Sequence, residues 1–277
     1  MEFKNDHLRL MPPRNVSVNL ANVKLPGGND VYFRAKQKEI VELYSAARIF
    51  MDLTETTDWD KWFSISKNAS ETDKECAQHF FENTYRSFFY ETALFYYNSI
   101  VDISWTMCYV AAEYSGQKNC KRVDINSIKS IDEAALLLRN TEKCVTNPTA
   151  ENNPFEYLMH VYPQFEPIIQ MVISFWNSFS DSEIRKNYNY CKHRGHPLYE
   201  EISRYTPNGV FSVKRIDHET GNLIETATNS MDVRYCLSLD NSIASLQQFD
   251  DDILYPYISN LISEIEKVIK PSSLIID

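Results

Sequence analysis

Apolar residues recur every three or four positions over most of this chain, which is the spacing of amphipathic helices. Over residues 34–53 they predict a first helix, with inward positions at Ile40, Tyr44, Ala47 and Phe50/Met51. Neither Pro nor Gly interrupts residues 72–114, whose many aromatic residues indicate a long, buried central helix. At 1.5 Å per residue that run would exceed roughly 60 Å, so we expect a bend or break within it.

Two further helices are predicted before the pattern changes. One covers residues 131–143, and the other begins near Pro154 and continues past Pro163 and Pro167 toward His193. Gly195 and Pro197 end the second helix. The same spacing predicts a last helix that begins at Asp240 or Asn241, is broken or kinked near Pro256 and reaches residues 268–269.

Between these helices the apolar period changes to two, which is typical of strands. Residues 210–213 and 223–226 flank Glu219-Thr220-Gly221-Asn222, the pattern of a hairpin, and residues 233–239 add a possible third strand. The fold class we predict is mainly α: a bundle of long helices with a small antiparallel hairpin or three-stranded sheet before the C-terminal helix. The predicted parts are an irregular N-terminal arm (1–33), the helical bundle (34–196), and the hairpin with the C-terminal helix (197–277), together one compact domain.

Composition and charge narrow the class of protein. The chain of 277 residues is 43% hydrophobic and contains 6 Gly against 17 Tyr and 15 Phe, which favours packed helices with a large core. Its formal net charge of −10 argues against an extended surface for duplex DNA. The six cysteines are scattered and form no CxxC pair, which predicts reduced thiols. Residues 1–14 contain no apolar leader, so we predict a cytoplasmic protein. Glu91, Asn98 and Asp102 interrupt the most apolar stretch, so we predict no membrane span.

The candidate chemistry lies in residues 185–197, where six basic or imidazole groups gather at the end of a predicted helix. Arg185 and His193 are eight positions apart and differ by about 80° in direction on a regular helix, so long side chains there can serve one cleft. An imidazole exchanges protons near neutral pH and a guanidinium grips phosphate, which suits metal-independent cleavage of RNA. The competing interpretation is structural, because basic residues in a last turn stabilise the negative end of the helix dipole. His196, before Pro197, is a weaker candidate.

A long helical bundle with an Arg…His segment late in a helix resembles the HEPN superfamily of prokaryotic helical proteins. The resemblance covers about residues 34–196 and implies a homodimeric, metal-independent RNase of a defence or toxin–antitoxin system. It gives catalytic roles to Arg185 and His193, and we predict that the neighbouring residues Lys186, Asn187, Lys192 and Arg194 bind the substrate. Seven residues separate Arg185 from His193, whereas the family pattern has four to six, and Lys186 follows the Arg. Two explanations fit this wider spacing: a π-bulge absorbs the extra residue, or the chain is a catalytically inactive member of the family.

Other polar groups are weaker candidates for chemistry. Glu91, Asn98, Asp102 and Glu113 lie roughly on one stripe of the long helix, either to orient His193 or as a solvated seam. Zinc ligation by Cys76, His79, Cys191, His193 and His196 fits no familiar spacing, and Asp250-Asp251-Asp252 lacks the pattern of a calcium loop. We therefore predict no metal and no cofactor. The alternative to an RNA-directed protein is a non-catalytic helical interaction or dimerisation protein.

Overall fold

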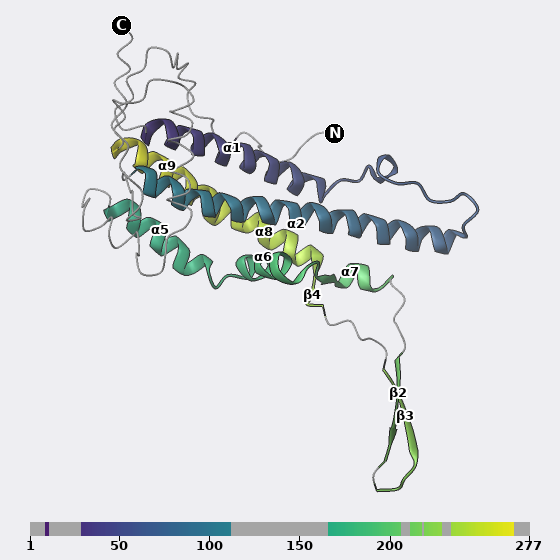
Figure 1. Cartoon of the computed structure of the whole chain (residues 1–277). Coiled ribbons are helices and arrows are strands. Elements are labelled where there is room, and N and C mark those ends of the chain that lie inside the picture. The colour runs from purple at the N-terminus through teal and green to yellow at the C-terminus, as the bar shows by residue number, and fades with distance from the viewer. Residues whose placement is uncertain are drawn as a thin grey trace, which may run out of the picture.

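A computed structural model describes residues 9–10, 29–111, 166–205, 211–217, 219–228 and 234–268, and over these ranges the protein is mainly α-helical, as predicted (Figure 1). Helices α1 (Asn29–Leu53) and α2 (Glu71–Ala111) lie side by side and make the largest contact between elements. Helix α1 begins at Asn29, five residues before the predicted start. Among the described helices, none combines the length and apolar composition that crossing a bilayer requires.

The remaining helices pack around α2. They are α5 (Glu166–Phe179), α6 (Glu183–Arg194), α7 (Glu200–Ser203), α8 (Leu239–Phe249) and α9 (Tyr255–Val268). The core is continuous across them, with Ile40 and Tyr44 of α1 and Leu94 and Tyr97 of α2 fully buried. The helix predicted at residues 131–143 lies outside the described residues.

Of the bend or break predicted in the long helix, the break is wrong, because α2 is a single α-helix of 41 residues. Its first turn is capped by Ser70, whose Oγ accepts a hydrogen bond from the Asp73 amide at 3.1 Å. Along its length α2 packs against α1, α5, α6, α7, α8 and α9 in turn. Tertiary contacts along its length therefore stabilise a helix that continues without a break.

The prediction of one helix running to His193 also needs correction. The chain leaves α5 at Phe179, and Ser182 starts α6 by accepting a hydrogen bond from the Arg185 amide through its Oγ at 3.2 Å. An N-cap serine satisfies an amide that has no partner within the helix. The end of α6 is as predicted, because Gly195 adopts φ 98°, a conformation that glycine tolerates.

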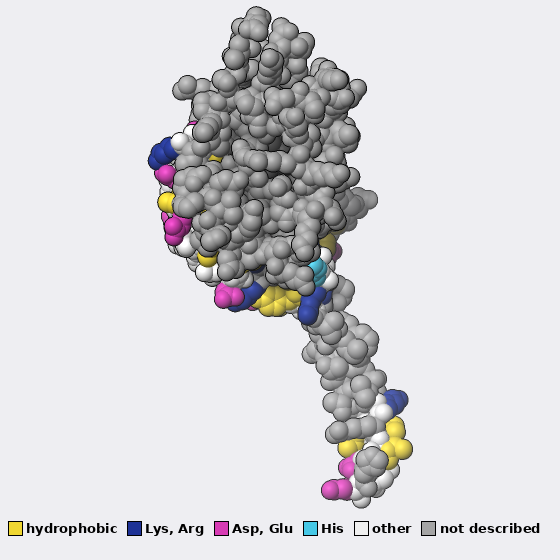
Figure 2. Space-filling view, turned by 60° about the vertical axis from the view of Figure 1, so that its left-hand side comes forward, with side chains coloured by type: hydrophobic (Ala, Val, Ile, Leu, Met, Phe, Trp, Pro, Cys, Tyr) yellow, Lys and Arg dark blue, Asp and Glu magenta, His cyan; other side chains and the backbone are white. Residues whose placement is uncertain are grey.

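The β structure consists of two separate pairs of strands. β2 (Phe211–Ile216) and β3 (Leu223–Thr228) form the predicted antiparallel hairpin, with Ile216 opposite Leu223 at its tip. Figure 2 shows this hairpin extending away from the helical body, with hydrophobic side chains at its end. A strand does lie within the predicted residues 233–239, but its predicted pairing is wrong: β4 (Cys236–Leu237) pairs in parallel with β1 (Leu198–Tyr199) and not with the hairpin.

A buried ion pair joins α1 to the junction between α8 and α9. Asp250 opens a π-helical turn (Asp250–Leu254) just before the proline at 256, where we predicted a kink. Its Oδ2 accepts hydrogen bonds from Arg48 Nη1 at 2.5 Å and from the Tyr97 hydroxyl at 2.9 Å. Arg48 is 4% and Asp250 1% exposed, so both charges are removed from water. Arg9 of the N-terminal arm pairs with the next residue, Asp251.

Candidate functional site

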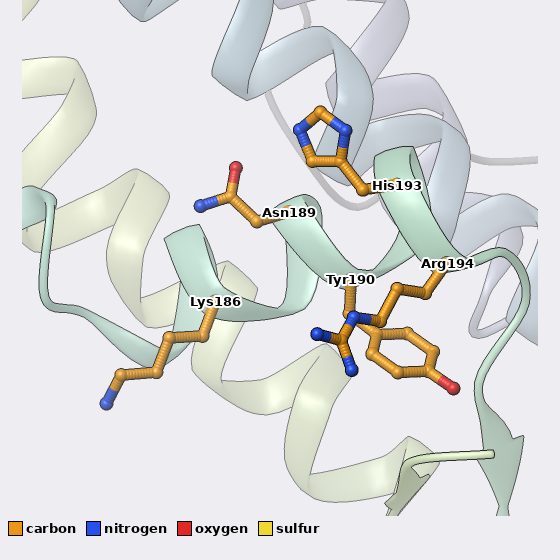
Figure 3. A pocket seen from close by; sticks show the side chains of 5 residues that line it. All are labelled: Lys186, Asn189, Tyr190, His193 and Arg194. Atoms are coloured by element: carbon orange, nitrogen blue, oxygen red, sulfur yellow. The ribbon is translucent and has the colours of Figure 1, made fainter. Parts of the chain in front are cut away.

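The exposed face of α6 forms a shallow depression on the protein surface. It has a volume of about 450 Å³ and is lined by Lys186, Asn189, Tyr190, His193 and Arg194, all from this one helix (Figure 3). Lys186, Asn189 and His193 recur at three and four positions, which places them on the same side of the helix. Lys186 donates a hydrogen bond to Glu183 Oε1 at 3.0 Å, one turn earlier. The depression is therefore open to solvent and rich in positive charge.

Arg185 lies outside this depression. Its Nη1 donates a hydrogen bond to Asn98 Oδ1 of α2 at 3.0 Å. Its guanidinium also sits over aromatic rings, 5.3 Å from the centre of Trp176 and 5.0 Å from that of Tyr188. Asn98 is fully buried, so Arg185 satisfies an amide oxygen inside the bundle. The structure thus directs Arg185 toward α2 and α5, whereas His193 faces solvent.

The predicted substrate-binding residues divide in the same way. Lys186 and Arg194 line the depression beside His193. Asn187 is only 5% exposed and donates a hydrogen bond to the Tyr90 hydroxyl of α2 at 3.3 Å. Lys192 is exposed, but its ammonium group lies 5.5 Å from the centre of the Tyr188 ring, on the side of α6 that faces α2. Two of the four predicted residues therefore share a surface with His193.

A second cluster, around Glu91, joins the end of α6 to α2. The Nδ1 atom of His196 lies 2.7 Å from Glu91 Oε1, and the Tyr199 hydroxyl donates to the same oxygen at 2.8 Å. The Phe88 ring packs against His196 with centroids 5.8 Å apart. Burial, together with the negative charge of Glu91, raises the pKa of Tyr199, so this hydroxyl stays protonated and donates. A carboxylate that holds one imidazole nitrogen orients the ring, and here it fixes the turn after α6.

The sequence contained part of the signal for this cluster. Glu91 and Asn98 were both placed on one polar stripe of the long helix, and both face α6. Their partners differ from the expected one, because they bind His196 and Arg185, not His193. Tyr199 carried no signal, since its contact with Glu91 depends on the turn at Gly195.

The surrounding protein raises the pKa of two titratable groups near α6. Burial raises the pKa of the Cys191 thiol to about 12, and the charge of Glu91 adds to this effect. Burial also raises the pKa of Asp102, while the positive charges of Arg185 and Lys192 oppose the change. A thiol with a raised pKa is a poor nucleophile, and Cys191 packs against the hydrophobic core. In the part of the chain that the structure describes, His, Cys, Asp and Glu side chains form no group of three or more with the spacing of a metal site.

The fold and this surface define a mainly helical protein with a solvent-open basic site on one short helix. Comparison of the chain with family models, with curated proteins and with solved structures found no match.

Proposed function

We propose that this chain is an HEPN-like, RNA-directed protein that binds an RNA phosphate on the exposed face of α6. The observation that supports the proposal is the clustering of Lys186, His193 and Arg194 around one depression, in a chain whose formal net charge is −10. A local basic site in an acidic protein attracts a polyanion to one place and repels it elsewhere. A homodimeric state, a cytoplasmic location and a role in defence or in a toxin–antitoxin pair belong to the same proposal.

The residues of the depression match the chemistry of single-stranded RNA. The Arg194 guanidinium offers two parallel donors to a phosphate, and the Lys186 ammonium adds a mobile charge at the other end of the helix. Tyr190 offers a partly exposed ring on which a base can stack, and the Asn189 amide can hydrogen-bond a base edge. This set recognises the backbone first and base identity second.

In this proposal the same residues of the depression also cleave the bound RNA. A neutral His193 takes the proton of a ribose 2′-hydroxyl, whose oxygen attacks the adjacent phosphorus as the bond to the 5′-oxygen breaks. The departing 5′-oxygen takes a proton from water, and Arg194 balances the charge on the phosphate oxygens. Arg194 thus takes the phosphate-holding role that the resemblance gave to Arg185, and Arg185 becomes a positioning residue that anchors α6 to Asn98.

A second candidate, a non-catalytic member of the same kind, is favoured by the contacts of Arg185. Because Arg185 is held by Asn98 and by aromatic rings, its guanidinium is not directed at the depression where His193 lies. In this version the α6 surface binds RNA without cleaving it.

The test uses the full chain with end-labelled single-stranded and hairpin RNAs, with and without chelator. We expect binding by the wild type, loss of binding in Lys186→Ala/Arg194→Ala, and chelator-resistant cleavage that His193→Ala abolishes without loss of binding. The matched control is Lys267→Ala, because Lys267 is similarly exposed and pairs with a glutamate three residues earlier, as Lys186 does. Binding without cleavage selects the non-catalytic candidate, and absence of binding refutes both.

A further inference from the structure

Two phenylalanine rings of α2 stay exposed beside α6. Phe88 is 48% and Phe95 37% exposed, although Phe89 in the same part of the helix is 7% exposed. Because seven residues make nearly two helical turns, the two rings point in almost the same direction, about 10 Å apart along the axis. Phe95 packs against Tyr188 with ring centroids 5.1 Å apart. Phe88 packs against His196, just after α6, with centroids 5.8 Å apart. This ring pair (Phe88 and Phe95) therefore borders the C-terminal half of α6.

Lys192 lies between the ring pair and the depression on α6. It follows Asn189 by three positions and precedes His193 by one, so it is next to the lining of the depression. Its exposed side chain places the ammonium group 5.5 Å from the centre of the Tyr188 ring, which is the ring that packs against Phe95. A cation therefore lies where a strand that leaves the depression would reach the first ring.

The hydroxyl groups next to the rings already have partners. Thr92 donates a hydrogen bond to the carbonyl of Phe88 at 2.7 Å. Ser99 donates to the carbonyl of Phe95 at 2.9 Å. A flat aromatic base can therefore cover either ring without stripping water from an unpaired hydroxyl.

The carboxylates near the ring pair are matched by positive or imidazole groups. Glu91 Oε1 lies 2.7 Å from Nδ1 of His196. Burial raises the pKa of Asp102, and the positive charges of Arg185 and Lys192 oppose that rise, so both cations act on this carboxylate. A phosphate that approaches the ring pair therefore meets carboxylates whose charge is offset by their neighbours.

Phe81 is the contrasting case on the same side of α2. It lies seven residues before Phe88 and is 40% exposed, so it presents a similar area of ring to solvent. It adjoins the first turns of α2, where Asp73 and Glu75 are exposed and form no ion pair with any other described residue. Negative charge at this end repels a phosphate. Phe81 thus matches the ring pair in exposure and differs from it in electrostatic surroundings.

We propose that the ring pair is a base-stacking platform, which receives the continuation of a single-stranded RNA bound on α6. The platform rests on the proposed function of the α6 depression. Lys192 holds the phosphate that links the two parts, and bases stack on Phe95 and then on Phe88. Aromatic faces beside a cation are the combination with which proteins bind single strands of any sequence. Because the bases of a duplex are stacked on one another, the platform selects unpaired RNA.

Fluorescence anisotropy of the full chain tests the platform, with end-labelled oligouridylates of about 3 and about 9 nucleotides, lengths below and within the usual range of single-strand sites. We expect the wild type to bind the longer RNA more tightly by about tenfold or more, because each stacked base contributes about that factor. Phe88→Leu/Phe95→Leu should lose most of this gain and bind the shorter RNA as the wild type does. Leucine keeps the apolar contacts of the two rings but has no aromatic face. The matched control, Phe81→Leu, should keep the gain.

Two more variants separate stacking from an indirect effect on the fold. Phe88→Trp/Phe95→Trp should keep or increase the gain, because tryptophan offers a larger aromatic face. Lys192→Ala should make the dependence of the logarithm of the association constant on that of the salt concentration shallower by about 0.7 for the longer RNA, which is the contribution of one phosphate contact on a single strand. The same variant should leave the salt dependence of the shorter RNA unchanged.

Equal affinity of the wild type for both lengths, or an undiminished gain in Phe88→Leu/Phe95→Leu, would overturn the proposal and leave the rings as a surface for a protein partner. A loss in Phe81→Leu as large as in that double variant would overturn it as well. Binding of the shorter RNA through Lys186 and Arg194 with no gain on lengthening refutes the platform alone. Binding of the longer RNA that depends on the ring pair but survives Lys186→Ala/Arg194→Ala refutes the α6 site alone, and binding of neither RNA refutes both.

Discussion

Removing one partner of the buried Arg48–Asp250 pair should destabilise the protein far more than removing both. The Arg48→Met variant leaves the Asp250 carboxylate 1% exposed without its cation, and Asp250→Asn removes the nearer carboxylate from the Arg48 guanidinium, whose Nη1 then faces Asp251 Oδ1 at 3.7 Å. Each single loss should cost about 3–5 kcal/mol of unfolding free energy, because an uncompensated charge stays buried. For a chain near this size that corresponds to a fall in Tm of roughly 10 °C.

The double variant Arg48→Met/Asp250→Asn should recover most of that loss. Asparagine keeps an oxygen for the Tyr97 hydroxyl, which donates to Asp250 at 2.9 Å, while methionine fills the space of the arginine stem. We expect the double variant within about 2 kcal/mol of the wild type, since both desolvated charges are gone. Thermal or urea unfolding of the four proteins measures the coupling. Strictly additive single effects would refute the assignment of a coupled buried pair.

The pH dependence gives this cycle a second readout. Burial raises the pKa of Asp250 above the unfolded value of 3.8, although Tyr44, Arg48 and Tyr97 oppose the change. Without Arg48 the pKa of Asp250 in the folded protein rises further. The loss of unfolding free energy caused by its buried charge is therefore absent below pH 3.8 and grows as pH rises through that folded pKa. The deficit of Arg48→Met relative to the wild type should therefore narrow on acidification toward pH 4, whereas that of Asp250→Asn should not narrow in this way.

Three further changes test other contacts. Arg185→Ala should lower the unfolding free energy by about 2–3 kcal/mol, because it leaves the buried Asn98 oxygen unpaired. The variant should keep its RNA affinity in a filter-binding assay. Lost affinity with normal stability would contradict the positioning role of Arg185. Gly195→Ala should cost about 2 kcal/mol in urea unfolding, since φ 98° strains alanine although no atom lies within 4 Å of its Cβ; an unchanged midpoint would argue against that conformation. Glu201 caps α8 through the Leu239 amide at 2.8 Å, and such hydrogen bonds outweigh burial and lower its pKa below 4.5. The stabilisation is then present above pH 4.5 and lost as pH falls through the folded pKa, so Glu201→Gln should flatten the acid side of the stability curve, and parallel curves would contradict this.

The helices were predictable because their signals are local. Apolar periodicity located α1 and α2, and Gly195 with Pro197 gave the end of α6. The continuity of α2 over 41 residues was not predictable, because it depends on neighbours that pack along its length. The pairing of β4 with β1 was missed for a related reason: two-residue strands form where Tyr199 and the end of α6 bring them together, and no periodicity marks them.

The sequence showed which segment carries the candidate site, but not which of its residues face solvent. Composition located the basic segment, but helical geometry was read as letting Arg185 and His193 serve one cleft, because the sequence did not show which side α2 would occupy. The structure puts α2 on the side of Arg185, Asn187 and Cys191, which leaves Lys186 and His193 on the open surface. Periodicity identifies the faces of a helix, whereas assigning a face to solvent requires the packed neighbours.

The most direct test of the RNA-binding surface is photo-crosslinking of the full chain to single-stranded RNA that contains 4-thiouridine, followed by peptide mapping. The account predicts crosslinks within α6, at Tyr190 or His193, that disappear in Lys186→Ala/Arg194→Ala and persist in Lys267→Ala. Crosslinks confined to the hairpin or to α2, or none above those of a competitor-saturated sample, would contradict it.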